Sequence, residues 1–301
     1  MRVVIALGGN ALLQRGETFS AENQRANIKR AALSIAAVIN AGHDVVLSHG
    51  NGPQVGLLAL EDAREPTSYF PLDVLTAETV GMIGYVIEQE LANLFPPAKM
   101  FATLLTQIEV DPQDPAFHLP TKPIGQLYTQ SDADAVAAAN GWTMARDGDK
   151  FRRVVASPVP KRILEIGVIR LLVEQGVTVI CTGGGGIPVI PLKNGGYLGI
   201  EAVIDKDRAS ALLASDIGAD ALLMLTDVGG IFTRWGQPDQ KLVTRMSLSE
   251  ARSQTLPPGS MGPKVEAAAA FIAAGGKLAG IGRLDDALAI LAGKAGTRIE
   301  P

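Results

Sequence analysis

The sequence predicts an α/β protein in which an open, mainly parallel sheet lies between two layers of helices, a three-layer αβα arrangement. Three observations point to this class. Apolar runs rich in Val and Ile recur along the 301 residues, they do not alternate with polar residues, and helical patterns separate them. Such runs are typical of parallel strands, because helices cover both faces of a parallel sheet.

Four apolar runs are the predicted strands: residues 3–7, 45–48, 177–182 and 221–226. A helix is expected between the first two, because Ile28 and Ile35 share one helical face and Gly42 follows as a C-terminal cap. The same order of helix, glycine and strand recurs before the third and fourth runs. This repetition of β-α-β units favours a parallel sheet.

Residues 111–159 interrupt the alternation of helix and strand. The segment is rich in proline and contains "ARDGDKFRRVV", which predicts a hairpin that turns at Asp147 and Gly148. We interpret it as a small excursion or lid, since lids on α/β enzymes close over substrate and exclude water. A surface insertion without such a role is the alternative.

Composition and charge argue against several classes of protein. The formal net charge is −4 and no Lys/Arg block is longer than two residues, so nucleic acid is not an expected partner. The apolar stretches are shorter than the roughly 20 residues of a membrane helix, and no signal-peptide pattern is present, so no membrane association is expected. Cys181 is the single cysteine, which rules out an intramolecular disulfide and fits a reducing cytoplasm.

Glycines gather where the predicted strands end. They occur in "LGGN" at 7–10, in "HGNGP" at 49–53 and in "GGGGIP" at 183–188. Ligands of parallel α/β sheets bind at the carboxyl ends of strands, where loops meet helix N-termini with free N–H groups. We therefore expect the loops to surround a phosphate group, with the N–H groups of residues 50–52 directed at the ligand and Pro53 opening the next helix.

Two common phosphate motifs compete with this interpretation. The stretch "GNGPQVG" has the glycine spacing of a dinucleotide-binding loop. However, Asp73, the acidic residue about 20 positions further on, lies in a proline-marked segment and does not close a second strand. No G-x-x-x-x-G-K-[ST] sequence occurs, so the chain is not expected to be a P-loop NTPase.

Three lysines lie beside glycine or acidic turns: Lys122 in the proposed lid, Lys206 in "DKD" and Lys264 at a helix start. Phosphoryl transfer depends on positioning and charge neutralisation, which lysines, Mg²⁺ and backbone N–H groups supply. The three histidines show no metal-ligand spacing, so we expect them to be structural or to support the site residues, and His49 alone is adjacent to a glycine loop. The pattern as a whole predicts a phosphoryl-transfer site.

With these motifs identified, the chain resembles the carbamate kinases of the amino acid kinase family. The resemblance runs nearly from end to end and rests on "VVIALGGNALL", "VVLSHGNGPQVGLL", "LTQIEVDPQDPAF", "CTGGGGIPV", "EAVIDKD" and "GSMGPKVEAA". It implies the amino acid kinase fold and reversible phosphoryl transfer between ATP and carbamate, with Mg²⁺, in a cytoplasmic homodimer. In the direction that forms ATP, carbamoyl phosphate and ADP react, and the released carbamate decomposes to ammonia and carbon dioxide.

The resemblance also implies roles for individual residues. The carbamoyl and phosphoryl groups would lie in a cradle formed by Gly8, Gly9, Asn10, Gly50, Asn51 and Gly52. Lys122, Lys206 and Lys264 would neutralise charge on the transferring phosphoryl group, and Asp205 would orient the lysines. The nucleotide would be bordered by Gly184, Gly185, Asp207, Thr226, Asp227, Met261 and Lys264. Mg²⁺ would bind mainly through the nucleotide phosphates, with no protein ligand expected.

By the same resemblance, residues 1–210 form an N-terminal lobe with the carbamate site, and residues 211–301 form a nucleotide-binding lobe. Ala6 stands where sister kinases carry the lysine of a K-x-G-G opening, which favours carbamate kinases, in which the lid lysine takes over that role. Gly229 and Gly230 depart from the acid-containing stretch of relatives, so the adenine-side contacts stay open. The alternatives are a kinase for another small carboxylate, or a nucleotide sensor without turnover, which would be expected to have lost one of the three lysines.

Overall fold

An eight-stranded sheet forms the centre of the chain in the computed structural model, which describes residues 1–9, 12–13, 16–63, 70–254 and 261–301. In the described part, all neighbouring strands of this sheet are parallel except β16 and β17. From one edge to the other, the strands are β15 (Arg245–Ser247), β17 (Thr297–Glu300), β16 (Leu278–Arg283), β12 (Ala221–Thr226), β1 (Arg2–Leu7), β2 (Asp44–His49), β9 (Thr178–Ile180) and β3 (Phe101–Thr103).

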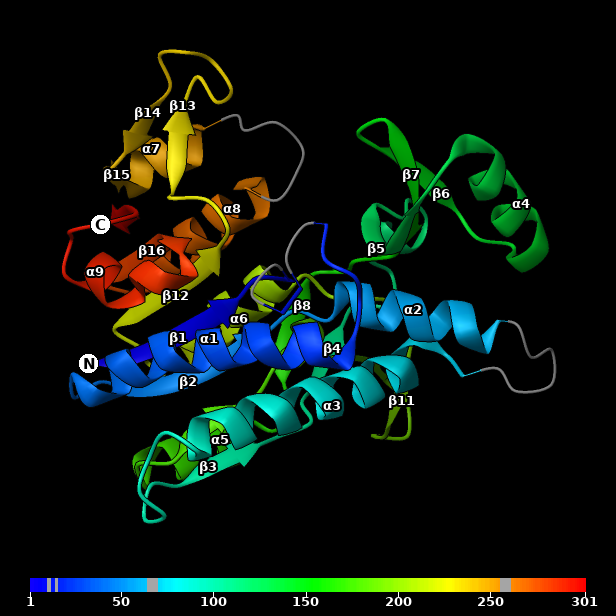
Figure 1. Cartoon of the computed structure of the whole chain (residues 1–301). Coiled ribbons are helices and arrows are strands. Elements are labelled where there is room, and N and C mark those ends of the chain that lie inside the picture. The colour runs from blue at the N-terminus through cyan, green and yellow to red at the C-terminus, as the bar shows by residue number, and fades with distance from the viewer. Residues whose placement is uncertain (10–11, 14–15, 64–69, 255–260) are drawn as a thin grey trace.

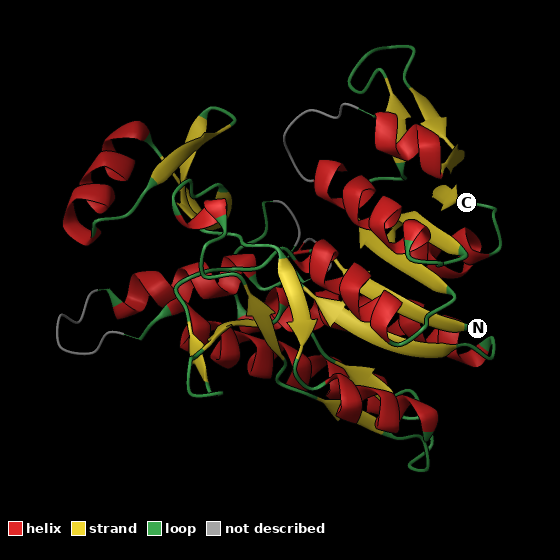
Figure 2. Ribbon diagram, turned by 180° about the vertical axis from the view of Figure 1, so that it is seen from behind, coloured by secondary structure: helices red, strands yellow, loops and turns green. Residues whose placement is uncertain are grey.

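Helices cover both faces of this sheet, as Figures 1 and 2 show from opposite sides. Val3 and Ile5 of β1 belong to the core with α1 (Ala21–Asn40), α3 (Leu72–Ala92) and α9 (Ala287–Leu291). Val4 and Ala6 belong to the core on the other face, with α5 (Ile166–Glu174), α6 (Lys206–Asp216) and α8 (Met261–Ala273). The α/β class and the mainly parallel sheet are thus confirmed.

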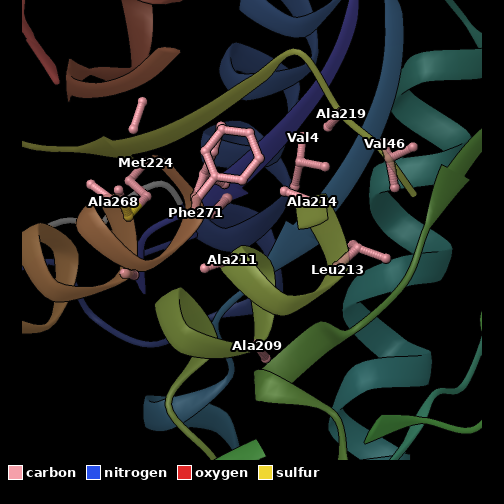
Figure 3. Close-up of a cluster of buried hydrophobic side chains, with 14 of the residues drawn as sticks. Val4, Val46, Ala209, Ala211, Leu213, Ala214, Ala219, Met224, Ala268 and Phe271 are labelled. Carbon is pink, nitrogen blue, oxygen red and sulfur yellow. The ribbon is translucent and has the colours of Figure 1, made fainter. Parts of the chain in front are cut away.

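The second of these cores joins distant parts of the chain. Figure 3 shows the ring of Phe271 from α8 among Val4 of β1, Met224 of β12 and small side chains of α6. Phe271 is 1% exposed, and burial of a side chain of this size contributes roughly 2–3 kcal/mol. Strands from both halves of the sequence therefore share one core.

The predicted elements are confirmed, with one shorter strand. Helix α1 begins after Ser20, whose hydroxyl accepts from the N–H of Asn23, and it ends just before Gly42, which has φ +84°. The strand expected over 177–182 is limited to Thr178–Ile180 as β9, because Thr182 has φ +49° and turns the chain into the glycine loop.

The lid is a separate small unit at residues 122–155, within the segment expected from the sequence. Strands β5 (Lys122–Tyr128), β7 (Lys150–Val155) and β6 (Met144–Asp147) form an antiparallel sheet with α4 (Gln130–Asn140) beside it, and Figure 1 shows this unit projecting past α2 (Gly52–Asp62). The predicted hairpin is confirmed, since Asp147 pairs with Lys150 and Gly148 has φ +68°. The Arg153 guanidinium lies 4.0 Å from the ring centroid of Trp142.

Two smaller sheets complete the fold. One contains β11 (Tyr197–Gly199), β10 (Ile187–Pro191), β4 (Gln107–Val110) and β8 (Pro160–Ile163), and the other is a hairpin of β13 (Ile231–Thr233) and β14 (Lys241–Val243). Helix α7 (Leu248–Ser253) is short, as are the 3-10 turns Pro115–Phe117, Gly183–Gly185 and Leu284–Asp286. Over the described ranges, each helix is too short or too polar to cross a lipid bilayer.

Candidate active site

The glycine loops after β1 and β2 lie against one another at the carboxyl edge of the sheet. A Cβ atom on Gly50 would lie 3.6 Å from the backbone N of Gly9 and 3.5 Å from Cδ of Lys206. Among the described residues, a Cβ on Gly9 would meet nothing within 4 Å, so this part of the loop borders open space. Asn10, which the sequence assigned to the same cradle, lies outside the described residues.

Two of the backbone N–H groups in these loops are used within the sheet. Gly50 donates to the carbonyl of Leu7 at 3.1 Å, and Gly8 donates to the carbonyl of Leu225 at 2.9 Å. The expectation that the Gly50 N–H points to a ligand is therefore wrong, because strand pairing continues one residue past β2. Gly52 begins α2, and the first N–H groups of a helix have no partner within it. These helical N–H groups are the candidates for binding an anion.

The third glycine loop, at residues 183–186, packs tightly against Asn51 in the loop after β2 and against Ile204. A Cβ on Gly184 would lie 2.6 Å from Nδ2 of Asn51, and a Cβ on Gly185 would lie 2.3 Å from the carbonyl oxygen of Ile204. Both glycines have positive φ values, 66° and 95°. Asn51 is buried and donates to Oγ1 of Thr79 at 3.0 Å, so the loop after β2 is fixed to α3. Any contact of Gly184 and Gly185 with nucleotide stays a prediction.

The N-terminus of α6 holds the first of two lysine–carboxylate groups. Asp205 is the N-cap residue, and its Oδ1 accepts from the N–H groups of Asp207 at 2.9 Å and Arg208 at 3.3 Å. Its Oδ2 accepts from Nζ of Lys122 at 2.5 Å, which connects the lid to α6. Burial would raise the pKa of Asp205, but the charge and hydrogen bond of Lys122 outweigh burial and hold this pKa well below its usual range.

Asp207 forms the second group. Lys206 donates to its Oδ1 at 2.5 Å and Lys264 donates to its Oδ2 at 3.0 Å. Burial acts to raise the pKa of Asp207, but the two lysine charges lower it overall. Burial lowers the pKa of Lys206, and the neighbouring charge of Lys264 adds to this, while Asp207 opposes both. The sequence assigned the orientation of lysines to Asp205 alone and placed Asp207 beside the nucleotide, so the bridging contact of Asp207 was missed.

The residues expected on the nucleotide side lie around the same edge. Thr226 ends β12 next to Gly8, since a Cβ on Gly8 would be 3.8 Å from its Cα, and its Oγ1 donates to Asp227 at 3.1 Å. Met261 begins α8 one turn before Lys264. Gly230 has φ +144°, packs against Thr297 and directly precedes β13. Their contacts with adenine stay predictions.

His49 is a buried residue beside the site, and the sequence left open whether it has a structural role or supports the site residues. Its Nδ1 lies 3.0 Å from the carbonyl oxygen of Gly50, and a Cβ on Gly183 would be 2.5 Å from its Nε2. Burial lowers its pKa from 6.5 to about 4, so the ring is neutral near pH 7 and Nδ1 donates the hydrogen bond. The imidazole thus fills the space beneath two glycine loops, and its position next to "GNG" was the available signal.

The carboxylates of the site are occupied by lysines. Among the residues that the structure describes, no three His, Cys, Asp or Glu side chains gather as a group that could hold a metal ion. Asp205 and Asp207, at the site, accept from three ammonium groups. The three lysine ammonium groups suit a site that binds an anionic ligand.

Comparison with known proteins assigns this arrangement to a family. The model of the amino acid kinase family matches residues 1–281. The chain belongs to the amino acid kinase family.

The carbamate kinase of Haemophilus influenzae is 54% identical over 302 residues, covering 99% of this chain and 96% of that protein. The solved carbamate kinase from Giardia lamblia bound to citric acid has a TM-score of 0.93 at 43% identity, covering 99% of this chain and 98% of the other. The same Giardia enzyme bound to AMP-PNP has a TM-score of 0.89 at 43% identity with the same coverage. The amino acid kinase fold and the resemblance to carbamate kinases are therefore confirmed.

Proposed function

We propose that this chain is a carbamate kinase, which transfers a phosphoryl group reversibly between ATP and carbamate. An oxygen of carbamate bonds to the γ-phosphorus while the bond from that phosphorus to the bridging oxygen of ADP breaks, giving carbamoyl phosphate and ADP. In the opposite direction, ATP forms and the released carbamate decomposes to ammonia and carbon dioxide. Identity of 54% over nearly the full chain to a carbamate kinase supports this activity.

The observation that carries the proposal is the meeting of three lysines from three elements at the N-terminus of α6. Lys122 comes from the lid, Lys206 from α6 and Lys264 from α8, and two carboxylates hold them in place. A transferring phosphoryl group carries negative charge on its outer oxygens, and fixed cations stabilise that charge. We assign to these lysines the neutralisation of the phosphoryl group.

The same site fits a small acceptor. The loops after β1 and β2 border open space at Gly9, and the glycine segments contain no arginine to grip a bulky acid. We propose that Gly8, Gly9, Gly50, Asn51 and Gly52 surround the carbamoyl group. Donors would come from the first turn of α2, whose dipole also favours an anion.

Nucleotide and Mg²⁺ are proposed to bind on the side of Thr226, Asp227 and Met261, in the lobe of residues 211–301. AMP-PNP binding by the Giardia relative supports a site for ATP. Because Asp205 and Asp207 are already engaged by lysines, we propose that Mg²⁺ enters with the nucleotide phosphates. When bound, the ion neutralises phosphate charge and orients the β- and γ-phosphates.

The decisive experiment is a coupled assay of ATP formation from carbamoyl phosphate, ADP and Mg²⁺. Acetyl phosphate replaces carbamoyl phosphate in a parallel reaction. The proposal expects turnover with carbamoyl phosphate and little with acetyl phosphate. Activity with acetyl phosphate alone would indicate a kinase for another small carboxylate, and inactivity with both would indicate a nucleotide sensor.

We also propose a homodimer in the cytoplasm. Exposed apolar side chains lie on elements at the β3 edge of the central sheet: Met100, Leu105, Val168 and Leu171. We propose that these side chains contribute to the dimer interface, since exposed apolar patches often mark protein–protein interaction sites. Light scattering of the purified protein should give twice the 31.5 kDa chain mass, and a mass of one chain would contradict the dimer.

A further inference from the structure

Gly56, the third glycine of "GNGPQVG", has no part in the site described above. It lies in α2 and faces the lid. A Cβ on Gly56 would lie 2.1 Å from both the backbone N and the Cα of Gly125 in β5. Non-bonded carbon atoms need about 3.5 Å, so α2 and β5 meet backbone to backbone, with no room for a side chain.

Gly125 is adapted to the same contact. Its φ of +73° is one that glycine adopts without strain, and a Cβ on it would lie 3.4 Å from Cα of Gly56. It follows Ile124, where the pairing of β5 with β7 becomes irregular. The backbone of β5 therefore leaves its partner strand at the point where it touches α2.

This contact lies at the base of the lid, close to Lys122. Ile124 is buried in a small apolar cluster with Val55 of α2 and Leu72 of α3, which fastens the lid to the body of the protein. Lys122 precedes Gly125 by three residues in β5 and reaches Oδ2 of Asp205. A shift of β5 away from α2 is therefore passed along a short strand to the Lys122 ammonium.

We infer that Gly56 and Gly125 are positioning residues that set the place of Lys122 for phosphoryl transfer, an inference that rests on the proposed function. A methyl group at position 56 requires α2 and β5 to separate by roughly 1 Å or more. A misplacement of about 1 Å can lower the rate of an enzyme by about 100-fold. The two glycines act through Lys122 and touch no substrate.

The variant Gly56→Ala tests this inference. We expect kcat for ATP formation to fall roughly 10- to 100-fold while the circular dichroism spectrum stays that of the folded protein. The matched control is Gly81→Ala in α3, another helical glycine, whose added Cβ would meet nothing within 4 Å and which should keep wild-type kcat. Wild-type kcat in Gly56→Ala would overturn the inference.

A double variant separates positioning from general damage. If Gly56 acts through Lys122, adding Gly56→Ala to Lys122→Ala changes kcat by less than about twofold, because the positioned group is already absent. A loss of equal factor in both backgrounds would mean that the glycine contact only supports the structure, and the inference would be wrong.

A crystal structure of Gly56→Ala gives a readout that does not depend on activity. We expect the hydrogen bond from Lys122 to Asp205 to be broken, and an unchanged 2.5 Å contact would refute the inference. An inactive wild-type protein would disprove the proposed function only, and this distance would still decide the positioning role. If Gly56→Ala does not fold, Gly125→Asn replaces it. Asparagine tolerates positive φ, and its Cβ clashes less than a Cβ on residue 56. The kcat for ATP formation and the distance from Lys122 to Asp205 are then measured on this variant.

Discussion

Asp207 gives Lys206 and Lys264 an environment unlike that of a surface lysine. The two side chains are only 12% and 7% exposed, and both ammonium groups bind the same carboxylate. Two cations on one anion leave net positive charge beside the loops after β1 and β2. Because water screens buried charges poorly, this positive charge can attract a phosphoryl group strongly.

Replacing Lys206 by alanine should lower kcat in the carbamoyl phosphate assay by roughly 10²- to 10³-fold, because it removes one of the cations that we propose to stabilise the transition state. Circular dichroism should show an intact fold. Lys277→Ala is the control, since Lys277 is 77% exposed and forms only a surface ion pair with Asp220. Turnover near the wild-type value would remove Lys206 from the mechanism.

His49 should make stability depend on pH in a defined range. Its pKa is 6.5 in the unfolded chain and about 4 in the folded protein, so between these values only the unfolded chain binds the proton. The free energy of unfolding should therefore fall by about 3 kcal/mol as pH decreases from above 6.5 to 4, with no contribution from His49 to the slope above this range.

Urea unfolding between pH 4.5 and 7.5 measures this dependence. The control is His49→Asn, whose amide can donate to Gly50 but does not titrate, and its slope over this range should be smaller. Equal slopes for wild type and variant would show that burial of His49 does not cause the effect.

At the scale of elements, the lid is joined to the body through Lys122 and Asp205. Lys122→Ala should lower kcat by a factor similar to that for Lys206→Ala, because the lid cation would no longer reach the phosphoryl group. Lys150→Ala, at the exposed turn of the same lid, is the control. A mild effect of Lys122→Ala would favour the alternative that residues 111–159 are a surface insertion.

The elements themselves were largely predictable, but their contacts were not. Unbroken apolar runs identify strands such as β1 and β12, because helices cover both faces of the sheet and exclude water from them. The glycines that follow these runs identify the edge of the sheet where the site lies. The glycines of "GNGPQVG" look alike in sequence, yet Gly52 opens a helix while Gly56 meets the lid. The partner of Gly56 is distant in the chain, and local spacing contains no information about such a contact.

The lysine set shows the same limit. Sequence pattern identified Lys122, Lys206 and Lys264 because they lie beside turns, and resemblance supplied their role. That Asp207 bridges two of them depends on the rotation of the first turn of α6 toward α8. Tertiary packing sets this rotation, and neither spacing nor composition reports it.

For the molecule as a whole, the central sheet ties the two halves of the sequence together. β1 pairs directly with β12, and Ile5 lies opposite Leu223 in the register. The expected boundary at 210 falls within α6, whose residues belong to the shared core. The lobes therefore stay a proposal about ligand placement, and the fold is expected to lose stability as one unit.

Leu223→Ala tests this cooperativity, because Leu223 is fully buried in β12. Truncation should lower the free energy of unfolding by about 2–5 kcal/mol and should speed amide exchange in β2 as well as in β12. Leu33→Ala, at a 55% exposed position of α1, should change stability little. Unchanged exchange in β2 would show that the halves unfold separately.

The stacking of Arg153 on Trp142 has an optical consequence. The chain contains two tryptophans, and Trp235, which is 62% exposed, lies between β13 and β14. Figure 1 shows this hairpin apart from the lid. In a Trp235→Phe protein, the single remaining indole would lie on the lid, with a cation 4.0 Å from its ring. Its emission would then come from the lid alone, so the fluorescence of this variant during turnover tests whether the lid moves.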